Sequence, residues 1–352
     1  MEQFLTKIYR WYEANKRDLP WRRTSNPYYI WVAEIILQQT RVQQGLEYYR
    51  RFTDRFPTIA ALANAPEGDV LKIWQGLGYY SRARNLQLSS RIIMERHSGK
   101  FPSDYKEILK LKGVGEYTAA AIASIAFNQP FAAVDGNIAR VLSRYYKILD
   151  PVDSGIGKRK IKGIAENILN RKSPGKHNQA LMEFGALQCI PSNPVCEECP
   201  VNDNCLAYIQ NLVDRIPVKS TPPKQKKRYF YYFLIEENES VYLHQRNGND
   251  IWKYLYEFPM VETDNSKSVA EVINSALPEL LHDTTGCVVT DIRGPVLHIL
   301  SHQKITAHFI RINKKSINKL SPPLIRINKK DIPKFAVPRL IEKYLSGNGF
   351  IV

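Results

Sequence analysis

The segment Leu111-Lys-Gly-Val-Gly-Glu-Tyr-Thr-Ala119 joins two amphipathic stretches, residues 105–111 and 118–127, through a turn that contains Gly113 and Gly115. Two glycines in this spacing allow a tight turn whose backbone N–H groups point outward at the start of the following helix. Such N–H groups can bind a phosphate oxygen. In a chain as basic as this one, the segment therefore predicts a helical hairpin that binds a DNA backbone without reading its sequence.

Helical periodicity surrounds this hairpin and extends from the N-terminus to about residue 214. Between Tyr28 and Tyr48, for example, apolar residues recur at helical spacing, and Asn26-Pro27 supplies a cap and a first-turn proline. Further amphipathic stretches cover residues 70–74, 83–94, 138–146 and 179–187. We therefore expect residues 1–214 to form an all-helical domain.

The composition changes between residues 215 and 228. This stretch contains three prolines, six basic residues and few residues that can fill a core, which is typical of a linker. Beyond it, aromatic and β-branched runs at residues 229–235 and 241–246 flank a polar turn and predict a β-hairpin. A helix at residues 269–281 and further strands at residues 286–292, 298–301 and 304–312 follow. Residues 229–352 are therefore expected to form a smaller α+β domain.

The chain is basic and shows no segment that could cross a membrane. Its 352 residues include 50 Lys and Arg against 34 Asp and Glu, a net charge of +16. The longest nearly unbroken apolar run, residues 119–127, is far shorter than the ~18 residues that a membrane-spanning helix needs. The first 18 residues mix charged and aromatic side chains without the apolar core of a secretory signal. We expect a two-domain protein in the reducing cytoplasm with a polyanionic partner.

Four of the five cysteines, Cys189, Cys196, Cys199 and Cys205, fall within the 17 residues of the segment 189–205. In a reducing compartment, metal ligation by such a cluster is favoured over disulfide formation. A zinc site usually has paired C-x2-C knuckles, and only one such pair is present here. Varied short spacings suit an iron–sulfur cluster better, with zinc as the alternative.

Taken together, these features resemble a known superfamily. The hairpin LKGVGEYTA, the segment Val134-Asp-Gly-Asn137 and the cysteine spacing resemble the helix-hairpin-helix DNA glycosylases of the endonuclease III superfamily. Residues 33–40, AEIILQQT, residues 76–85, GLGYYSRARN, and the second domain make the chain similar to the MutY-type adenine DNA glycosylases. The resemblance implies a mainly α helix-hairpin-helix domain with a 4Fe–4S cluster on the four cysteines, and a smaller α+β Nudix-like domain.

The resemblance implies an enzyme of base excision repair that removes adenine from double-stranded DNA where the adenine lies opposite 8-oxoguanine or guanine. Cleavage of the N-glycosidic bond needs an acid for the leaving base and a negative charge near the cationic sugar. By the resemblance, Glu34 protonates adenine N7 and later activates water, and Asp135 stabilises the sugar cation. Glu34 lies between apolar Ala33 and Ile35, so burial is expected to raise its pKa. For Asp135, beside a helix start, a simple N-cap is the alternative.

Tyr117 separates two types of glycosylase. In the bifunctional type a lysine fills this position and attacks the sugar, whereas a phenol cannot form a Schiff base. The resemblance therefore implies a monofunctional hydrolase, with Tyr117 and Asn137 orienting Asp135 and the sugar. Two alternatives stay open: a lyase-type glycosylase for oxidised pyrimidines, and a non-catalytic DNA-binding protein whose cluster senses redox state.

The resemblance also assigns the residues that contact DNA. Gln39 and Tyr79 fill the gap that an extruded adenine leaves in the duplex. Trp21, Arg22 and Glu183 line the adenine pocket. A monomer in the cytoplasm, at the nucleoid if the source is bacterial, is expected. The remaining DNA-contacting positions of the helical domain are Gln38, Thr40, Gly113 and Gly115.

The segment Trp252-Lys-Tyr-Leu-Tyr-Glu-Phe-Pro259, followed by a helix, resembles a Nudix-like domain. A working Nudix hydrolase carries Arg-Glu-x-x-Glu-Glu on that helix, and residues 269–276 lack this set, so pyrophosphatase activity is not expected. The family uses the domain to read 8-oxoguanine through a Phe-Ser-His loop, which here is Leu300-Ser301-His302. Ser301 and His302 can hydrogen-bond to a base edge, whereas Leu300 replaces the aromatic residue. A polar turn without this role is the alternative.

Overall fold

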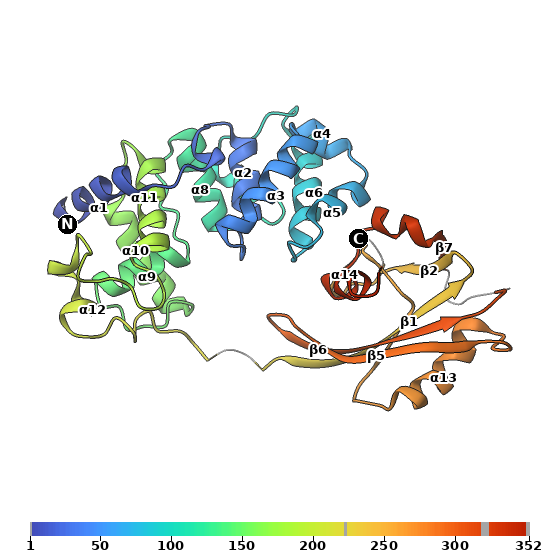
Figure 1. The fold of residues 1–352 in the computed structure, drawn as a ribbon. Coiled ribbons are helices and arrows are strands. Elements are labelled where there is room, and N and C mark those ends of the chain that lie inside the picture. Colours follow the sequence, from blue (N-terminus) through green and yellow to red (C-terminus); the bar gives the residue numbers. More distant parts are fainter. Residues whose placement is uncertain (1, 222–223, 318–323, 350–352) are drawn as a thin grey trace. The chain divides into compact units, whose positions relative to one another are not determined.

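The computed structural model describes residues 2–221, 224–317 and 324–349 (Figure 1). The chain forms two compact units. The first comprises Met1–Asn64 and Asn85–Thr221, and the second comprises Ala65–Arg84 and Pro222–Val352. A short segment from the helical part of the sequence thus belongs to the C-terminal unit. Within the described residues, no helix is both long and apolar enough to span a bilayer.

The first unit is helical, as its periodicity predicts, and α11 packs against α1, α8 and α9. Helix α6 (Ser81–Arg96) begins in the second unit and continues into the first. The other described elements are α1 (Glu2–Asn15), η1 (Pro20–Arg22), α2 (Pro27–Ile36), α3 (Val42–Arg55), α4 (Ile59–Asn64), α7 (Tyr105–Leu109), α8 (Glu116–Phe127), α9 (Gly136–Tyr145), α10 (Gly155–Ile168), α11 (Pro174–Leu187), η2 (Asn202–Asn204) and α12 (Leu206–Ile209).

Residues 28–48, expected as one helical stretch, form two helices. α2 ends at Ile36, and α3 begins at Val42. Between them, Gln39 has a left-handed backbone with a φ of 57°, which a right-handed helix cannot include. The apolar spacing continues across this break and therefore does not reveal it. The break places residues 38–40 in a short loop.

The predicted helical hairpin is present. Residues 110–115 join α7 to α8, and within them Gly113 has a φ of 78°, a backbone conformation that favours glycine. Gly115 is the N-cap of α8, so the N–H groups of the first helical turn follow the hairpin directly. A Cβ atom at Gly113 would lie 3.0 Å from the side chain of Asn85, because the hairpin packs closely against α6. The hairpin therefore leads directly into the N-terminal end of α8.

The second unit contains a mixed sheet of order β3-β2-β1-β6-β5, in which β1 and β6 are parallel. The other pairs are antiparallel, with β4 beside β1 and β7 beside β2. The elements are α5 (Glu67–Trp74), β1 (Lys226–Glu237), β2 (Ser240–Gln245), β3 (Tyr256–Glu257), β4 (Met260–Thr263), α13 (Val269–Leu281), β5 (Val288–Ile299), β6 (Gln303–Asn313), β7 (Ile325–Asn328), η3 (Lys329–Lys334) and α14 (Arg339–Ser346).

Strand β1 is covered on both faces (Figure 1). Its even-numbered residues from 230 to 234 belong to the core that includes α14, and its odd-numbered residues from 231 to 235 belong to the core that includes α13. Successive side chains of a strand point to opposite faces, so a strand buried on both sides is apolar at every position. The expected hairpin with β2 is confirmed, with Glu236 opposite Val241.

Residues 286–292 and 298–301, expected as separate strands, belong largely to one strand, β5. Two register shifts against β6, on either side of Asp291 to Arg293, carry this strand past Gly294. Gly294 has a φ of 134°, and a Cβ atom there would lie 2.8 Å from the carbonyl oxygen of Ala307. The prediction of two strands is wrong because Gly-Pro usually ends a strand, whereas pairing with β6 continues this one through a bulge.

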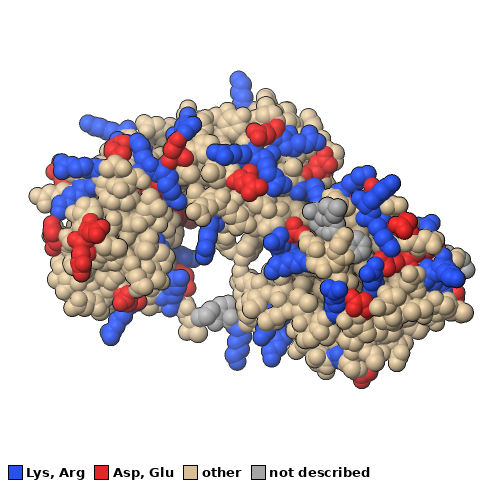
Figure 2. Space-filling view, in the orientation of Figure 1, with Lys and Arg blue, Asp and Glu red and all other residues tan. Residues whose placement is uncertain are grey.

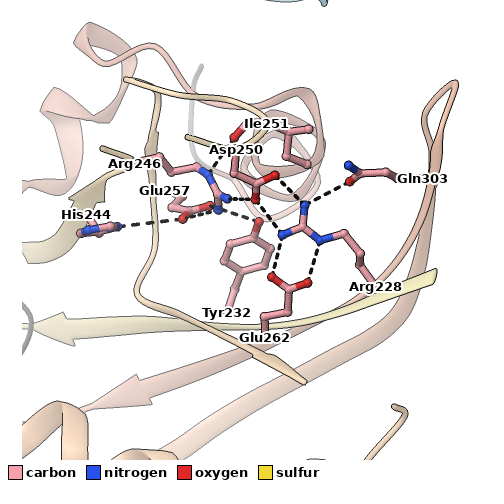
Figure 3. A network of polar contacts seen from close by, with 9 residues as sticks. All are labelled: Arg228, Tyr232, His244, Arg246, Asp250, Ile251, Glu257, Glu262 and Gln303. Atoms are coloured by element: carbon pink, nitrogen blue, oxygen red, sulfur yellow. Dashed lines mark hydrogen bonds and ion pairs between the residues drawn. The ribbon is translucent and has the colours of Figure 1, made fainter. Parts of the chain in front are cut away.

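A network of charged side chains joins β1, β3, β4 and the loop after β2 (Figure 3). Arg228 donates hydrogen bonds to Glu262 and Asp250 at 2.6–2.9 Å. Arg246 donates to Asp250 and Glu257 at 2.8–3.0 Å. Asp250 therefore lies between the two guanidinium groups. Each buried arginine faces carboxylates, which compensates the cost of taking its charge out of water.

Candidate active site

Helix α2 places a carboxyl group inside the first unit. Asn26 caps this helix, because its side chain accepts a hydrogen bond from the Tyr28 N–H at 2.9 Å. Glu34 lies in the last turn between the buried residues Ala33 and Ile35, and is itself 8% exposed. The cap sets where α2 begins, and the apolar face of the helix packs inward. Glu34 therefore lies in the protein interior.

Tyr117, in the first turn of α8, is the hydrogen-bond partner of Glu34. Its hydroxyl group donates to Glu34 Oε2 at 2.6 Å. Burial raises the pKa of Glu34 to about 7; the charge of Asp135 acts in the same direction, and the hydrogen bond from Tyr117 opposes it. Burial likewise raises the pKa of Tyr117, so the phenol keeps its proton. Glu34 can therefore be protonated near neutral pH, as its apolar neighbours in the sequence predict.

Asp135 is the N-cap of α9. Its Oδ1 accepts a hydrogen bond from the Ile138 N–H, and its Oδ2 accepts one from Asn137 Nδ2, both at 2.7 Å. Burial raises the pKa of Asp135, and these hydrogen bonds oppose the rise. The capping role considered for Asp135 is thus real, and the same carboxyl group also lines two cavities together with Tyr117.

Hydrogen bonds continue from Asn137 to the cysteine loop. Arg140 donates to Asn137 Oδ1 at 2.9 Å, to the carbonyl oxygen of Gly185 at 2.6 Å and to that of Cys189 at 2.7 Å. A Cβ atom at Gly185 would lie 2.9 Å from the carbonyl oxygen of Asn137, so α11 approaches α9 as only glycine permits. This close packing fixes the orientation of Asn137 and, through it, of Asp135.

A cavity of about 170 Å³ lies against Glu34 in the first unit. The structure brings both carboxyl groups to this cavity together with the residues expected to line the base pocket. Its lining includes Trp21, Arg22, Glu34, Tyr117, Asp135, Asn137, Met182 and Glu183.

Glu183 differs from Glu34 although both line the same cavity. It accepts hydrogen bonds from Arg22 at 2.7–2.8 Å and from the backbone N–H and Nε of Arg17 at 2.8–2.9 Å. Burial opposes ionisation, but these hydrogen bonds outweigh it and lower the pKa of Glu183 to about 2. Arg17 was not among the predicted site residues, because nothing in its local sequence indicates a partner 166 positions away.

A larger cavity, of about 1000 Å³, opens beside Tyr117 and Asp135. Side chains of α8 and α10 line it, among them Lys158, Arg159 and Lys162. Nothing in the sequence indicates this groove, since α10 carries no recognisable motif. Tyr117 and Asp135 are therefore accessible from two cavities.

The loop between α2 and α3 carries the predicted glutamine positions. Gln38 Nε2 donates a hydrogen bond to Thr118 Oγ1 at 3.3 Å, which ties the loop to α8. Thr40 Oγ1 donates to the carbonyl oxygen of Gln38 at 3.4 Å, and the side chain of Gln39 is exposed.

Lys and Arg side chains outnumber acidic ones on the visible surface (Figure 2).

The four clustered cysteines line a common small cavity of about 30 Å³, and Arg144 Nη1 lies 3.5 Å from Cys189 Sγ. Among the His, Cys, Asp and Glu side chains that the structure describes, no three are placed to hold a single metal ion. Zinc draws its ligands around one point, whereas a 4Fe–4S cluster gives each thiolate its own iron and spreads the sulfur atoms apart. Four thiols around one cavity are the donor set that a 4Fe–4S cluster takes, one thiolate for each iron. They are Cys189, Cys196, Cys199 and Cys205.

The second unit holds the predicted reading loop, in the turn between β5 and β6. Ser301 and His302 are exposed, and the Leu300 side chain packs against the core that includes α14. Tyr79, which the same unit contains, is 46% exposed, and its hydroxyl group is hydrogen-bonded to Ser301 Oγ. Leu300 is thus engaged in the core, while Tyr79 and Ser301 lie together at the surface.

Family models match three parts of the chain. Residues 32–171 match the HhH-GPD superfamily of base excision DNA repair proteins, and residues 189–205 match the iron–sulfur binding domain of endonuclease III. Residues 231–347 match the NUDIX domain. The fold expected from the sequence, a helix-hairpin-helix domain with a 4Fe–4S cluster motif and a Nudix-like domain, is confirmed.

Individual relatives extend this similarity. A solved thermostable thymine-DNA glycosylase superposes with a TM-score of 0.55 at 30% identity, over 59% of this chain and 95% of that one. The human adenine DNA glycosylase is 42% identical over 213 residues, which are 58% of this chain and 39% of the human protein. The adenine DNA glycosylase of Buchnera aphidicola subsp. Baizongia pistaciae is 36% identical over 318 residues, or 89% of this chain and 88% of that protein. With 36% identity to such a relative along nearly its whole length, the chain belongs to the adenine DNA glycosylase family.

Proposed function

We propose that this chain hydrolyses the N-glycosidic bond of adenine in double-stranded DNA where the adenine lies opposite 8-oxoguanine or guanine, and leaves an abasic site. The observation that carries the proposal is the hydrogen bond from Tyr117 to Glu34 in a cavity that Asp135 also lines. A protonated carboxyl group and a carboxylate beside one cavity are the groups that glycoside hydrolysis requires. A protein that only binds DNA would have no use for this arrangement.

Glu34 is the acid of the proposed reaction. With a pKa of about 7, a large fraction of Glu34 is protonated at neutral pH, so it can donate a proton to adenine N7. The C1′–N9 bond then breaks, and the base leaves as neutral adenine with the bonding electron pair. Glu183 cannot supply this proton, because its pKa of about 2 keeps it ionised. Its ion pairs hold Arg17 and Arg22 at the wall of the cavity.

Asp135 stabilises the positive charge that develops on the sugar. A carboxylate held by Asn137 and the start of α9 is oriented before the charge appears, so little reorganisation is needed. Glu34, now ionised, accepts a proton from water while the water oxygen bonds to C1′. Tyr117 carries no amine and cannot form a Schiff base, so the strand is not cleaved by this route.

The DNA contacts of the proposal use both units. The N–H groups at Gly113 and Gly115 bind a phosphate, while Gln38 and Thr40 contact the duplex near the target. Gln39 and Tyr79 are both exposed at loop positions with a positive φ, which suits side chains that fill the gap left by an extruded base.

Ser301 and His302 read the base opposite adenine in this proposal. Both are exposed in a short turn, and both carry groups that can donate or accept hydrogen bonds at a base edge. Leu300 takes no part in stacking, because its side chain packs inward.

The cysteine loop completes the DNA-binding unit. When bound, a 4Fe–4S cluster supplies four iron–thiolate bonds that tie residues 189–205 together. Arg140 and Arg144 hold the start of this loop through the carbonyl oxygens of Cys189 and Ile190. The enzyme is proposed to act as a monomer in the cytoplasm, at the nucleoid in a bacterial cell.

Single-turnover assays on duplexes with adenine opposite 8-oxoguanine, guanine or thymine test the proposal. Products are resolved with and without alkali. We expect strand breaks only after alkali, and only opposite 8-oxoguanine or guanine. Breaks without alkali would indicate a lyase, and an absence of breaks in protein with a full complement of iron would leave only DNA binding.

A further inference from the structure

The segment Ala65–Arg84 carries the exposed Tyr79 and belongs to the C-terminal unit. It lies between two stretches of the helical unit in the sequence, so its assignment is not evident from the order of residues. Side chains at the two ends of the Tyr79 loop show what holds it there.

Both backbone groups of Val337 are bonded to this segment. The Val337 N–H donates to Gln75 Oε1 at 3.4 Å, and the Val337 carbonyl oxygen accepts from the Tyr80 hydroxyl group at 3.3 Å. All three residues are buried, so these hydrogen bonds satisfy backbone groups that water does not reach. Val337 directly precedes the N-cap of α14. It is thus hydrogen-bonded to both ends of the loop of residues 75–80, the Tyr79 loop.

Neighbouring contacts reinforce this attachment. Gln75 Nε2 donates to Glu342 Oε1 of α14 at 3.4 Å, and Lys72 Nζ donates to the Phe335 carbonyl oxygen at 3.4 Å. The Tyr80 hydroxyl group also accepts a hydrogen bond from the Gly76 N–H at 3.3 Å, which closes the loop on itself. Gln75 thus contacts α14 directly, whereas Tyr80 contacts its own loop and Val337, just before that helix.

The loop between Gln75 and Tyr80 has a positive φ angle at three positions. Gly76, Gly78 and Tyr79 have φ angles of 91°, 77° and 47°. The Gly78 carbonyl oxygen accepts hydrogen bonds from Trp74 Nε1 and Arg82 Nη2, both at 3.1 Å. A positive φ at a tyrosine is held only where the surroundings determine it, and here the result is an exposed ring whose hydroxyl group meets Ser301.

We infer that Gln75 and Tyr80 are positioning residues for recognition of the base opposite adenine. Their hydrogen bonds to Val337 hold Tyr79 and Ser301 as one element that is assembled before DNA binds. A binding surface that is already ordered loses less conformational entropy on association, so the preference for 8-oxoguanine depends on this attachment. The inference rests on the proposed reading of 8-oxoguanine by Ser301.

Tyr80→Phe and Gln75→Leu remove the two hydrogen bonds to Val337 with little change in volume. They also remove the bonds of the same side chains to Gly76, Glu342 and Lys72. Tyr28→Phe is the matched control, because it also removes a buried hydroxyl group, which donates to the Phe56 carbonyl oxygen at 2.6 Å in the first unit. Melting temperature and cluster absorbance verify that each variant is folded.

Two readouts are made on each variant. The first is the ratio of dissociation constants for duplexes that carry an uncleavable 2′-fluoro-adenosine opposite 8-oxoguanine or guanine. The second is hydrogen exchange of residues 76–79, 300–302 and 335–339 in the protein without DNA. We expect Tyr80→Phe and Gln75→Leu to lower the preference for 8-oxoguanine about threefold to tenfold and to speed exchange in all three segments. Tyr28→Phe should change neither.

Unchanged exchange at residues 300–302 in both variants would overturn the inference, whatever the DNA preference. A wild-type preference that survives both substitutions would overturn it as well. A wild type without preference, but with coupled exchange in the variants, would instead overturn the proposed reading of 8-oxoguanine and keep the preassembled element.

Discussion

Glu34 and Glu183 show how one cavity gives two carboxyl groups opposite properties. Burial governs Glu34, whose pKa rises to about 7, whereas Arg17 and Arg22 govern Glu183, whose pKa falls to about 2. Groups whose surroundings move their pKa values apart are the usual acid and anion of an active site. The proposed role of Glu34 as the acid rests on this difference in environment.

The rate of adenine release should fall as the pH rises through about 7, because the raised pKa means that Glu34 loses its transferable proton above that value. Glu34→Gln should lower the single-turnover rate by about 10²–10⁴-fold and retain DNA binding. Glu95→Gln, at an exposed helix position, is the control. A rate that stays level between pH 6 and pH 8.5 would contradict the assignment.

Asp135→Asn separates capping from catalysis. Asparagine caps a helix as well as aspartate does, so we expect the free energy of unfolding to change by less than about 1 kcal/mol. The rate of adenine release should fall by about 100-fold or more, since the neutral amide cannot stabilise a sugar cation. Urea unfolding and single-turnover kinetics on the same preparation check this, and equal activity of the variant would leave Asp135 as a cap alone.

The position of Asp135 in the candidate site depends on how α9 packs against α11. Gly185 lets the two helices approach so closely that a methyl group would meet both the side chain and the backbone of Asn137. Asn137 in turn holds Asp135. A substitution where α9 and α11 cross can therefore displace the Asp135 carboxylate without contacting it.

Gly185→Ala should destabilise the protein by about 1–3 kcal/mol, because α11 must move away from α9. Adenine release should slow at the same time, as Asn137 is displaced. Gly163→Ala in α10, where a Cβ atom would meet nothing within 4 Å, is the matched control and should be neutral or stabilising by up to about 1 kcal/mol. Thermal unfolding and single-turnover kinetics distinguish the two, and equal behaviour would refute the packing argument.

The charge network of the sheet is expected to contribute to the stability of the C-terminal unit. Arg228→Met should destabilise the C-terminal unit by about 3–5 kcal/mol, because Glu262 and Asp250 lose a buried partner. Arg326→Met, whose exposed side chain pairs with Glu237 at 3.1 Å, should cost less than about 1 kcal/mol. Urea titration that gives similar losses for both would show that the network contributes no more than a surface pair.

The charge of the whole chain governs how it meets DNA. A net charge of +16 attracts the phosphate backbone irrespective of sequence, and each phosphate that is neutralised releases counterions. Both units display basic side chains (Figure 2). The same charge therefore supports binding to DNA irrespective of its sequence.

Affinity for an undamaged duplex should fall linearly with the logarithm of salt concentration, by about tenfold or more between 50 and 200 mM salt. Fluorescence anisotropy measures this slope. The ratio of affinities for 8-oxoguanine and guanine opposite adenine should vary less with salt, since it arises from hydrogen bonds to a base edge. An affinity for undamaged DNA that is insensitive to salt would show that phosphate contacts contribute little.

Local patterns in the sequence suffice for the elements that short-range physics controls. The helix at residues 269–281 has the predicted bounds, because a capping box between Ser268 and Glu271 starts it where the apolar periodicity begins. The glycine hairpin, the doubly buried strand β1 and the cysteine loop follow from local spacing in the same way. The raised pKa of Glu34 was also predictable, since its nearest neighbours are apolar.

The tertiary structure alone reveals what depends on residues far apart in the sequence. Arg17 reaches Glu183 across 166 positions, the Tyr79 loop belongs to the C-terminal unit through Val337, and β5 continues past Gly294 because β6 lies beside it. None of these three features has a periodic signal in the sequence. The interactions that stabilise them are made with residues that only folding brings together. Turn and helix propensities act over a few residues, whereas desolvation, ion pairing and backbone strain are set by the complete packed environment.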